Sequence, residues 1–439
     1  MSFPRYRQYK DSGVEWLGEV PEHWEVRSIK SLSPVRRGAS PRPIDDPKYF
    51  DDEGEFAWVR IADVSACDGL LKETTQRLSE LGSSLSVKIY PGALFVSIAG
   101  TVGKPCISAI KACIHDGFVY FPSLQIAPRF LHRIFEAGNC YGGLGKWGTQ
   151  LNLNTDTIGS IRIALPPEGE LTQLLAFLDR ETGKIDELVA EQQRLMELLK
   201  EKRQAVISHA VTKGMNPRAP MKPSGIEWLG DVPEHWRVVQ LGKVCDKVSD
   251  GPHFSPQYVD TGVLFLSARN VKVDGWALDD VKYVSEADCE EFDRRVVPQI
   301  GDVLYTKGGT TGIARVVDLE GRFQVWVHIA VLKVKQDTVD PHFLAFALNS
   351  VGCYEQSQLL TRGATNNDLG LTRMIKIWFV LPPIEEQRQV VAFLRSETKN
   401  LDALAAEAQK AIDLLQERRT ALISAAVTGQ IDVRKLAAA

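Results

Sequence analysis

The chain has 439 residues, enough for two to four domains with cores of their own. Its 44% hydrophobic and 25% charged residues are typical of a globular protein, and a net charge of −4 excludes a global basic field. Any contact with a polyanion must therefore use local patches. The seven scattered cysteines show no metal-ligand spacing, and neither a long apolar run nor a signal-like start is present. These features predict a cytoplasmic protein with free thiols and no membrane contact.

Two sequence repeats divide the chain into two similar halves. Residues 12–24 (SGVEWLGEVPEHW) and 224–236 (SGIEWLGDVPEHW) are identical at 11 of 13 positions, and residues 176–212 match residues 392–428 at 20 of 37. The two offsets, 212 and 216 residues, are nearly equal, so the chain consists of two copies of one repeated unit. The predicted segments are a first frame segment (1–24), a variable domain (25–164), a helix (165–214), a second frame segment (215–236), a second variable domain (237–380), a C-terminal helix (381–434) and a tail that resembles a tag remnant (435–439).

The repeated frame motif is rich in aromatic residues. We predict that its tryptophans anchor the start of each domain against the helices; they are Trp16, Trp24, Trp228 and Trp236. His23 and His235, in the Pro-Glu-His-Trp of each copy, are expected to pack or to form hydrogen bonds rather than to catalyse.

Each variable domain is predicted to be a mixed α/β (α+β) globule. Its expected strands are residues 56–61 and 92–98 in the first domain, and 263–268 and 301–306 in the second. Gly92–Gly103 aligns without gaps on Gly301–Gly312. The two domains should therefore share a fold while most of their surface residues differ.

A long helix is predicted to close each half. Each follows a strand-like run and Leu-Pro-Pro, since proline is tolerated at the first helical position, and each ends at a glycine, Gly214 or Gly429. Some 43 residues make a helix of roughly 65 Å. Steps of seven residues predict an apolar seam formed by Leu178, Ile185, Leu199, Val206, Leu394, Leu401, Leu415 and Leu422, with Leu188, Leu195 and Leu404 beside it. The two helices are expected to pair as a coiled coil; the alternative is that each lies on its own domain.

No motif for catalysis or for a metal stands out. Gly100-Thr-Val-Gly-Lys104 resembles part of a nucleotide-binding P-loop, but Ile98 and Pro105 occupy two of its required positions, and the equivalent Gly309-Thr-Thr-Gly-Ile313 lacks the lysine. Each stretch is either a turn that needs positive φ or a turn whose amides and hydroxyls hold a DNA phosphate.

Candidate DNA contacts lie in loops at matching positions of the two domains. Arginine and lysine read guanine, and asparagine and glutamine read adenine. In the first domain the candidates are Arg60, Lys104, Lys146, Thr149, Gln150, Asn152 and Asn154. In the second they are Arg269, Asn270, Lys307, Thr310, Arg362, Thr365, Asn366 and Asn367.

These features together resemble the specificity subunit of type I restriction–modification enzymes. The resemblance covers essentially the whole chain. It rests on the two frame motifs and on LPPEGELTQLLAFLDRETGKID (165–186) and LPPIEEQRQVVAFLRSETKNLD (381–402), which occur twice in the required order.

The resemblance implies a non-catalytic DNA-binding protein of host defence. Two target recognition domains would each read half of a bipartite, asymmetric site in double-stranded DNA, and the helices would pair antiparallel and fix the gap. Two modification (methyltransferase) subunits would dock on the frame, and restriction subunits on those. The chain itself would need no cofactor and no metal, since S-adenosylmethionine, ATP and Mg would bind the partner subunits.

Two alternatives remain open from the sequence. One is a stand-alone DNA methyltransferase or endonuclease with degenerate motifs. The other is a duplicated scaffold that binds proteins instead of DNA.

Overall fold

The computed structural model describes residues 3–142, 144, 153–362 and 368–436. The chain divides into two compact units: unit 1 comprises Met1–Gln193 and Lys410–Ala439, and unit 2 comprises Arg194–Gln409. The two longest helices, α6 (Glu168–Lys213) and α11 (Ile384–Val427), each contribute to both units. Each unit is thus a globular domain packed on its own part of the helix pair.

The ends of the long helices are set by proline and glycine. The carbonyl of Pro167 accepts a hydrogen bond from Leu171 N–H at 2.8 Å, so this proline precedes α6 instead of occupying its first position. At the other ends, Gly214 and Gly429 have φ of +77° and +76°, a region that glycine reaches without a Cβ clash. The predicted glycine caps are confirmed, and Gln430 N–H completes the second one by bonding the carbonyl of Ala425 at 2.7 Å.

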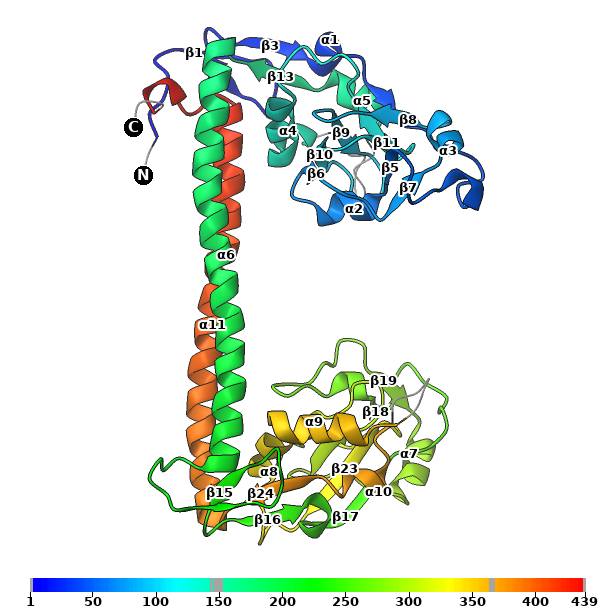
Figure 1. Ribbon diagram of the computed structural model, residues 1–439, viewed down its shortest axis with the longest axis vertical. Coiled ribbons are helices and arrows are strands. Elements are labelled where there is room, and N and C mark those ends of the chain that lie inside the picture. The colour runs from blue at the N-terminus through cyan, green and yellow to red at the C-terminus, as the bar shows by residue number, and fades with distance from the viewer. Residues whose placement is uncertain (1–2, 143, 145–152, 363–367, 437–439) are drawn as a thin grey trace. The chain divides into compact units, whose positions relative to one another are not determined.

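The two helices pack together side by side and antiparallel, as predicted (Figure 1). Of the predicted seam, Leu178, Ile185, Leu394, Leu401 and Leu422 are buried, whereas Leu199, Val206 and Leu415 are half-buried. The prediction that Leu188, Leu195 and Leu404 also join the seam is wrong, because 45%, 42% and 54% of their surfaces are exposed. A single partner helix covers only a narrow stripe, which leaves these leucines uncovered.

The domain of unit 1 is built on two sheets. One has the order β4-β12-β9-β10-β6 and the other β7-β5-β11-β8. The strands are β4 (Arg36–Arg37), β5 (Phe56–Val59), β6 (Leu70–Leu71), β7 (Gln76–Leu78), β8 (Val87–Ile89), β9 (Leu94–Ser97), β10 (Pro105–Ser108), β11 (Ala112–Ile114) and β12 (Phe118–Tyr120). The shorter helices are α1 (Ile29–Leu32), α2 (Ile61–Ala66), α3 (Glu80–Ser84), α4 (Pro128–Ala137) and α5 (Thr155–Ser160). Two further strand pairs connect the domain to the helices: β1 (Tyr9–Asp11) with β2 (Glu19–Pro21), and β3 (Glu25–Ser28) with β13 (Arg162–Leu165).

The domain of unit 2 repeats this plan with fewer strands. Its sheets have the orders β17-β23-β20-β21 and β19-β18-β22. The strands are β17 (Cys245–Asp250), β18 (Val263–Leu266), β19 (Lys282–Val284), β20 (Val303–Thr306), β21 (Ala314–Val316), β22 (Phe323–Val325) and β23 (Ile329–Val334). The shorter helices are α7 (Glu286–Asp293), α8 (Pro341–Leu348), α9 (Val351–Leu360) and α10 (Leu371–Met374). The two connecting strand pairs recur as β14 (Met221–Pro223) with β15 (Asp231–Pro233), and β16 (Arg237–Gln240) with β24 (Trp378–Leu381).

The faint repeat between the domains corresponds to equivalent strands. β9 pairs antiparallel with β10 and β12, as β20 does with β21 and β23. The turn after β9 has Gly100 and Gly103 at φ +64° and +86°, and the turn after β20 has Gly309 and Gly312 at +72° and +93°. The predicted common fold is confirmed, and both glycine motifs form turns that require positive φ.

The two chain ends meet in unit 1. Asp432 N–H donates to the carbonyl of Pro4 at 2.7 Å, and Tyr9 Oη donates to the carbonyl of Gly429 at 3.1 Å. Figure 1 shows the segment that follows α11 beside β1. The first frame segment therefore follows the end of α11 as the second follows the end of α6. Lys435 lies in a short 3-10 helix and Leu436 packs on the core, so folded structure continues past the predicted boundary at 435.

Candidate nucleic-acid interface

Each domain is fixed to the helices by the frame motif. In unit 1, Trp24 is fully buried and its Nε1–H donates to Glu170 Oε1 at 2.9 Å, while His23 Nε2 lies 2.8 Å from Glu170 Oε2. Tyr6 Oη donates to the same carboxylate. Glu170 lies in the first turn of α6, where the helix dipole favours a negative charge. Trp16 is half-buried against the same core.

The same arrangement recurs in unit 2 with one difference. Trp236 is fully buried, and His235 Nε2 lies 2.8 Å from Oε2 of Glu386, in the first turn of α11. Among the described residues, however, no partner bonds Trp236 Nε1. Trp228, 38% exposed, lies against Gly352, where a Cβ would come within 2.0 Å of its ring. Both histidines thus take the hydrogen-bonding role predicted for them.

In each unit, an arginine from one of the two long helices also connects the helix pair to the domain. In unit 1, Arg419 on α11 bonds Asp186 on α6 through Nε and Glu136 on α4 through Nη1, both at 2.8 Å. Arg133 bonds the other oxygen of Glu136 at 2.8 Å. Burial alone would raise the pKa of Glu136, but the two guanidinium groups outweigh it and hold the pKa below its ordinary value.

In unit 2 the equivalent arginine makes the equivalent contacts. Arg203 on α6 forms an ion pair with Asp402 on α11, with Nε 3.3 Å from Oδ1, and another with Asp274 of the domain. Arg203 and Asp402 are the repeat counterparts of Arg419 and Asp186, 216 residues apart in both cases. This pair was not predicted from the sequence, although the arginine and the aspartate are both retained at equivalent positions of the two copies.

The glycine turn of unit 1 is tied to α2. Lys104 Nζ donates to the carbonyls of Ser65 and Cys67 at 2.9 and 3.0 Å, so the lysine caps the carboxyl end of the helix. Ser65 Oγ lies 2.7 Å from Thr101 Oγ1 in the turn. Arg60 is exposed at the other end of α2 and donates to Gln76. The structure thus brings Arg60 and Lys104 to opposite ends of one short helix.

The second predicted segment of unit 1 is only partly described. Asn154 caps α5, since its Oδ1 accepts hydrogen bonds from the backbone N–H groups of Asp156 and Thr157 at 2.9 Å. Lys146, Thr149, Gln150 and Asn152 lie outside the described residues.

In unit 2 an ion-pair network holds two predicted segments together. Lys307 is 4% exposed, and its Nζ lies 2.8 Å from Asp368 Oδ1 and 3.4 Å from Asp250 Oδ2. Arg295 also bonds Asp250, at 2.6 Å. The backbone of Asp368 pairs with that of Arg362. The glycine turn and the segment that begins at Arg362 therefore share one anchor. Thr365, Asn366 and Asn367 lie outside the described residues.

The remaining candidates of unit 2 differ in exposure. Asn270 is buried, and its amide bonds Ser267 and the carbonyl of Ala277, each at 2.8 Å. Arg269, Thr310 and Arg362 are exposed. Asn270 and Lys307 thus use their polar atoms inside the domain, whereas the exposed three are accessible to a ligand.

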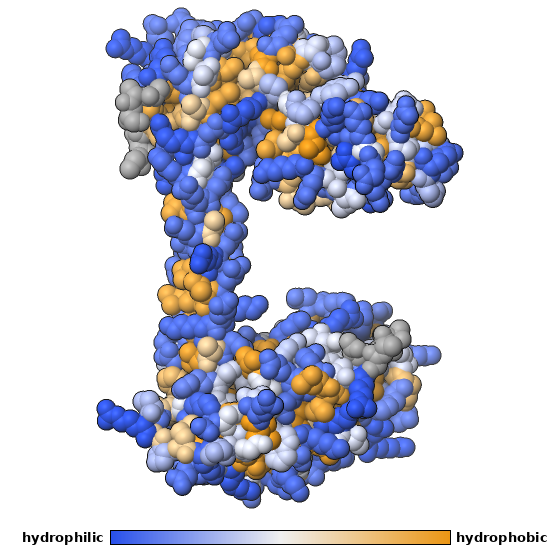
Figure 2. Space-filling view, viewed as in Figure 1, coloured by the Kyte–Doolittle hydropathy of each residue, from blue (hydrophilic) through white to orange (hydrophobic). Residues whose placement is uncertain are grey.

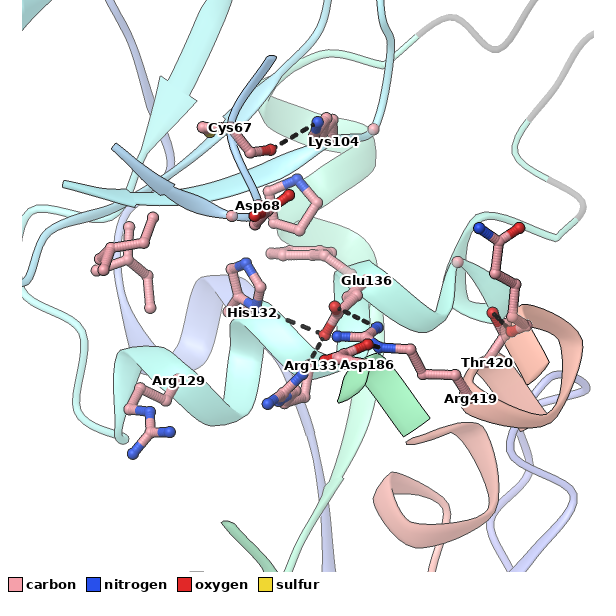
Figure 3. A pocket seen from close by; sticks show the side chains of 18 of the residues that line it. Cys67, Asp68, Lys104, Arg129, His132, Arg133, Glu136, Asp186, Arg419 and Thr420 are labelled. Atoms are coloured by element: carbon pink, nitrogen blue, oxygen red, sulfur yellow. Dashed lines mark hydrogen bonds and ion pairs between the residues drawn. The ribbon is translucent and has the colours of Figure 1, made fainter. Parts of the chain in front are cut away.

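Unit 1 also contains a cavity of about 1090 Å³ between its domain and the helix pair (Figure 3). His132 and Glu136 on α4, Cys67 and Lys104 of the domain, and Arg419 line it. Burial lowers the pKa of His132, which keeps the imidazole neutral, and no described residue bonds its Nε2. The arginines Arg129, Arg133 and Arg419 that line the cavity in Figure 3 are each paired with a carboxylate, whereas Lys104 bonds only backbone carbonyls.

The part of the chain that the structure describes has neither a cluster of metal-ligating side chains nor a helix suited to span a membrane. No three His, Cys, Asp or Glu residues gather there in a way that could hold a metal ion. Within the same residues, no helix combines the length and apolar character that crossing a membrane requires.

Comparisons with known proteins agree with this architecture. Residues 233–413 match the family model described as "Type I restriction modification DNA specificity domain". The chain is 22% identical over 436 residues to the specificity subunit of the type I restriction enzyme MjaVIII of Methanocaldococcus jannaschii, covering 95% of each chain. It is 20% identical over 439 residues to that of EcoKI of Escherichia coli K12, covering 94% of this chain and 90% of the relative. Over nearly its whole length, the chain is thus similar to type I restriction enzyme specificity subunits.

A solved structure shows the same fold for a member of such a system. A chain from a study titled "Structural basis underlying complex assembly and conformational transition of the type I R-M system" superposes with a TM-score of 0.67 at 19% identity. The match covers 93% of this chain and 98% of that chain. The similarity therefore extends over both units and both long helices.

Proposed function

We propose that this chain is a type I restriction–modification specificity subunit that reads a bipartite, asymmetric DNA site, one half with each domain. The observation that carries the proposal is that the contacts between each domain and the long helices occur twice. The same His–Glu and Arg–Asp contacts hold two domains of one topology, yet the residues around their equivalent turns differ. Two domains that are attached to the helices in equivalent ways but have different surfaces are suited to read two different half-sites.

The exposed polar residues of the domains are the proposed DNA contacts. Arg60 in unit 1, and Arg269, Thr310 and Arg362 in unit 2, have exposed side chains on loops or at helix ends. Arginine is suited to bidentate contact with guanine or with phosphate. The candidates outside the described residues remain proposals from the sequence.

The partners are proposed to dock on the long helices. Several leucines of these helices are exposed; they are Leu188, Leu195, Leu198, Leu404 and Leu414, at 42–56% of their surfaces. Figure 2 shows hydrophobic residues among hydrophilic ones on the visible face of the helices. Such leucines favour contact with other proteins. We propose that two modification subunits cover them, and that restriction subunits join through the modification subunits.

Methylation, translocation and cleavage are proposed to take place in those partners, which would carry the S-adenosylmethionine, ATP and Mg. The relatives are named as specificity subunits, so neither a stand-alone methyltransferase nor a protein scaffold is favoured. Seven free cysteines accord with the proposed cytoplasmic location.

The test is reconstitution with the cognate modification subunit, followed by sequencing of methylated bases. We expect one bipartite motif. Replacing residues 25–164 with the first domain of another family member should change one half-site only, because each domain reads its half through its own loops. The matched control exchanges residues 237–380 and should change the other half. Absence of a bipartite motif, or a change in both halves from one exchange, would contradict the proposal.

A further inference from the structure

Two cysteines of unit 1 lie next to one another beside the cavity of Figure 3. Cys67 follows the last residue of α2 and Cys106 lies in β10, with their Sγ atoms 3.5 Å apart. Cys106 is fully buried, whereas Cys67 is half-buried and lines the cavity. All seven cysteines are described, and no other pair of their sulfurs is within hydrogen-bonding distance.

We propose that Cys67 and Cys106 form a redox-active dithiol that a peroxide or a diazene oxidises reversibly to a disulfide. With hydrogen peroxide, the Cys67 thiolate attacks one oxygen, the O–O bond breaks, and Cys67 becomes a sulfenic acid; the other oxygen leaves as hydroxide, which takes up the proton that Cys67 released and becomes water. The Cys106 thiol then loses its proton and attacks Cys67, the S–O bond breaks, and a second water leaves. Two thiols and one peroxide thus give one disulfide and two waters. With a diazene, the thiolate adds to one nitrogen of the N=N bond, and attack by Cys106 on Cys67 then breaks the S–N bond and releases a hydrazine, which carries the two protons of the thiols.

The surroundings of the two sulfurs suit these separate roles. Cys67 reaches the cavity and therefore the oxidant, while Cys106, behind it, can react only with Cys67. The ammonium of Lys104, held 3.0 Å from the carbonyl of Cys67, places a positive charge near the attacking thiolate. Cytoplasmic disulfides are generally transient and sensory, which accords with a pair that is reduced at rest.

Formation of the disulfide would change the region of the candidate DNA contacts. A disulfide requires sulfurs about 2.05 Å apart, so the end of α2 and β10 must approach one another. Lys104 bonds the carbonyl of Cys67, and Arg60 begins the same helix. The reduced and oxidised forms therefore place Arg60 and the glycine turn differently. This consequence rests on the proposed function; the thiol chemistry does not.

The first experiment needs no DNA. The full chain is treated with diamide, free thiols are blocked with N-ethylmaleimide, and its peptides are mapped with and without dithiothreitol. We expect a cross-linked Cys67–Cys106 peptide that dithiothreitol releases, and the same cross-link in Cys113→Ser, a variant of another buried thiol of this domain. If Cys67 carries N-ethylmaleimide after full reaction with diamide, and no cross-linked Cys67–Cys106 peptide is found, the proposal is overturned. Because the wild-type map decides the matter, the result does not depend on whether Cys67→Ser or Cys106→Ser folds.

The second experiment uses the chain reconstituted with its modification subunit. Oxidation should raise the KM for methylation of a target duplex several-fold, and dithiothreitol should restore it. Cys67→Ser should be insensitive to oxidation, with its melting temperature measured to show that it folds. An unchanged KM in a cross-linked sample would overturn the link to recognition. Failure of the reduced enzyme to read a bipartite site would instead count against the proposed function and leave the peptide map standing.

Discussion

Cys67 shows how neighbours set the reactivity of one side chain. The hydrogen bond from the Cys106 thiol, the N–H of Gly69 and the charge of Lys104 lower the pKa of Cys67, against burial and the opposing charge of Asp68. That hydrogen bond and burial raise the pKa of Cys106. The imidazole of His132, which packs on Gly69, is neutral and adds no charge. Cys67 is therefore the thiol of the pair that loses its proton more readily.

Alkylation measures this directly. Only the thiolate reacts with iodoacetamide, so the rate at Cys67 should rise with pH to a midpoint below the value of about 8.5 that is typical of a free thiol. Cys106→Ala removes the hydrogen-bond donor and should move the midpoint upward. Rates at single cysteines are read by mass spectrometry. A midpoint at or above 8.5 in the wild type would contradict the assignment.

At the scale of the elements, the duplicated arginine joins three helices of unit 1. In Arg419→Ala, α11 loses its bonds to α6 and α4, and Glu136 keeps only Arg133 as a partner of opposite charge. We expect unit 1 to lose about 1–3 kcal/mol of stability, the usual cost of removing one partner of a partly buried charged pair. Thermal unfolding measures the loss. Arg418→Ala, an exposed neighbour on the same helix, is the matched control and should change stability little.

The same variant should show a defined pH dependence. Because the pKa of Glu136 is depressed in the folded chain, its stabilisation is fully present above the unfolded value of about 4.3 and is lost as pH falls through the folded value. The difference between wild type and Arg419→Ala should therefore be constant near pH 7 and shrink in acid. A difference that persists unchanged at pH 3 would show that packing, not charge, accounts for it.

The elements were predicted better than the candidate site. Leu-Pro-Pro, the glycine caps and the seven-residue seam are local patterns, so the long helices could be located from them to within a few residues. Leu188 and Leu404 fit the same pattern, but the pattern does not say how many helices pack together, and with a single partner helix these two leucines stay exposed. For the site, the roles of Asn270 and Lys307 come from partners brought near by folding: the ion pair of Lys307 joins residues 61 positions apart. The bond between Arg419 and Asp186 spans 233 positions, which periodicity cannot reveal.

At the scale of the whole molecule, the helix pair is the element that both units share. One heptad inserted after Gln193 in α6, with another after Gln409 in α11, keeps the seam in phase and adds about 10 Å of helix. If the pair spaces the half-sites, the gap should lengthen by about 3 base pairs while both half-sites stay the same. Sequencing of methylated bases measures this. A heptad in α6 alone is the control and should destabilise the pair, whereas altered half-sites in the double insertion would contradict the spacing role.

The meeting of the chain ends has a consequence for the order of events during synthesis. Unit 2 is one continuous segment, residues 194–409, and can fold while the ribosome is still translating. Unit 1 has no such option, because its core includes Ile423, Ala426, Val427, Ile431 and Val433, which are translated after all of unit 2. The domain that emerges first must therefore wait, with part of its apolar surface uncovered, until these later residues have been translated. The half of the protein that is translated first is the half that is completed last.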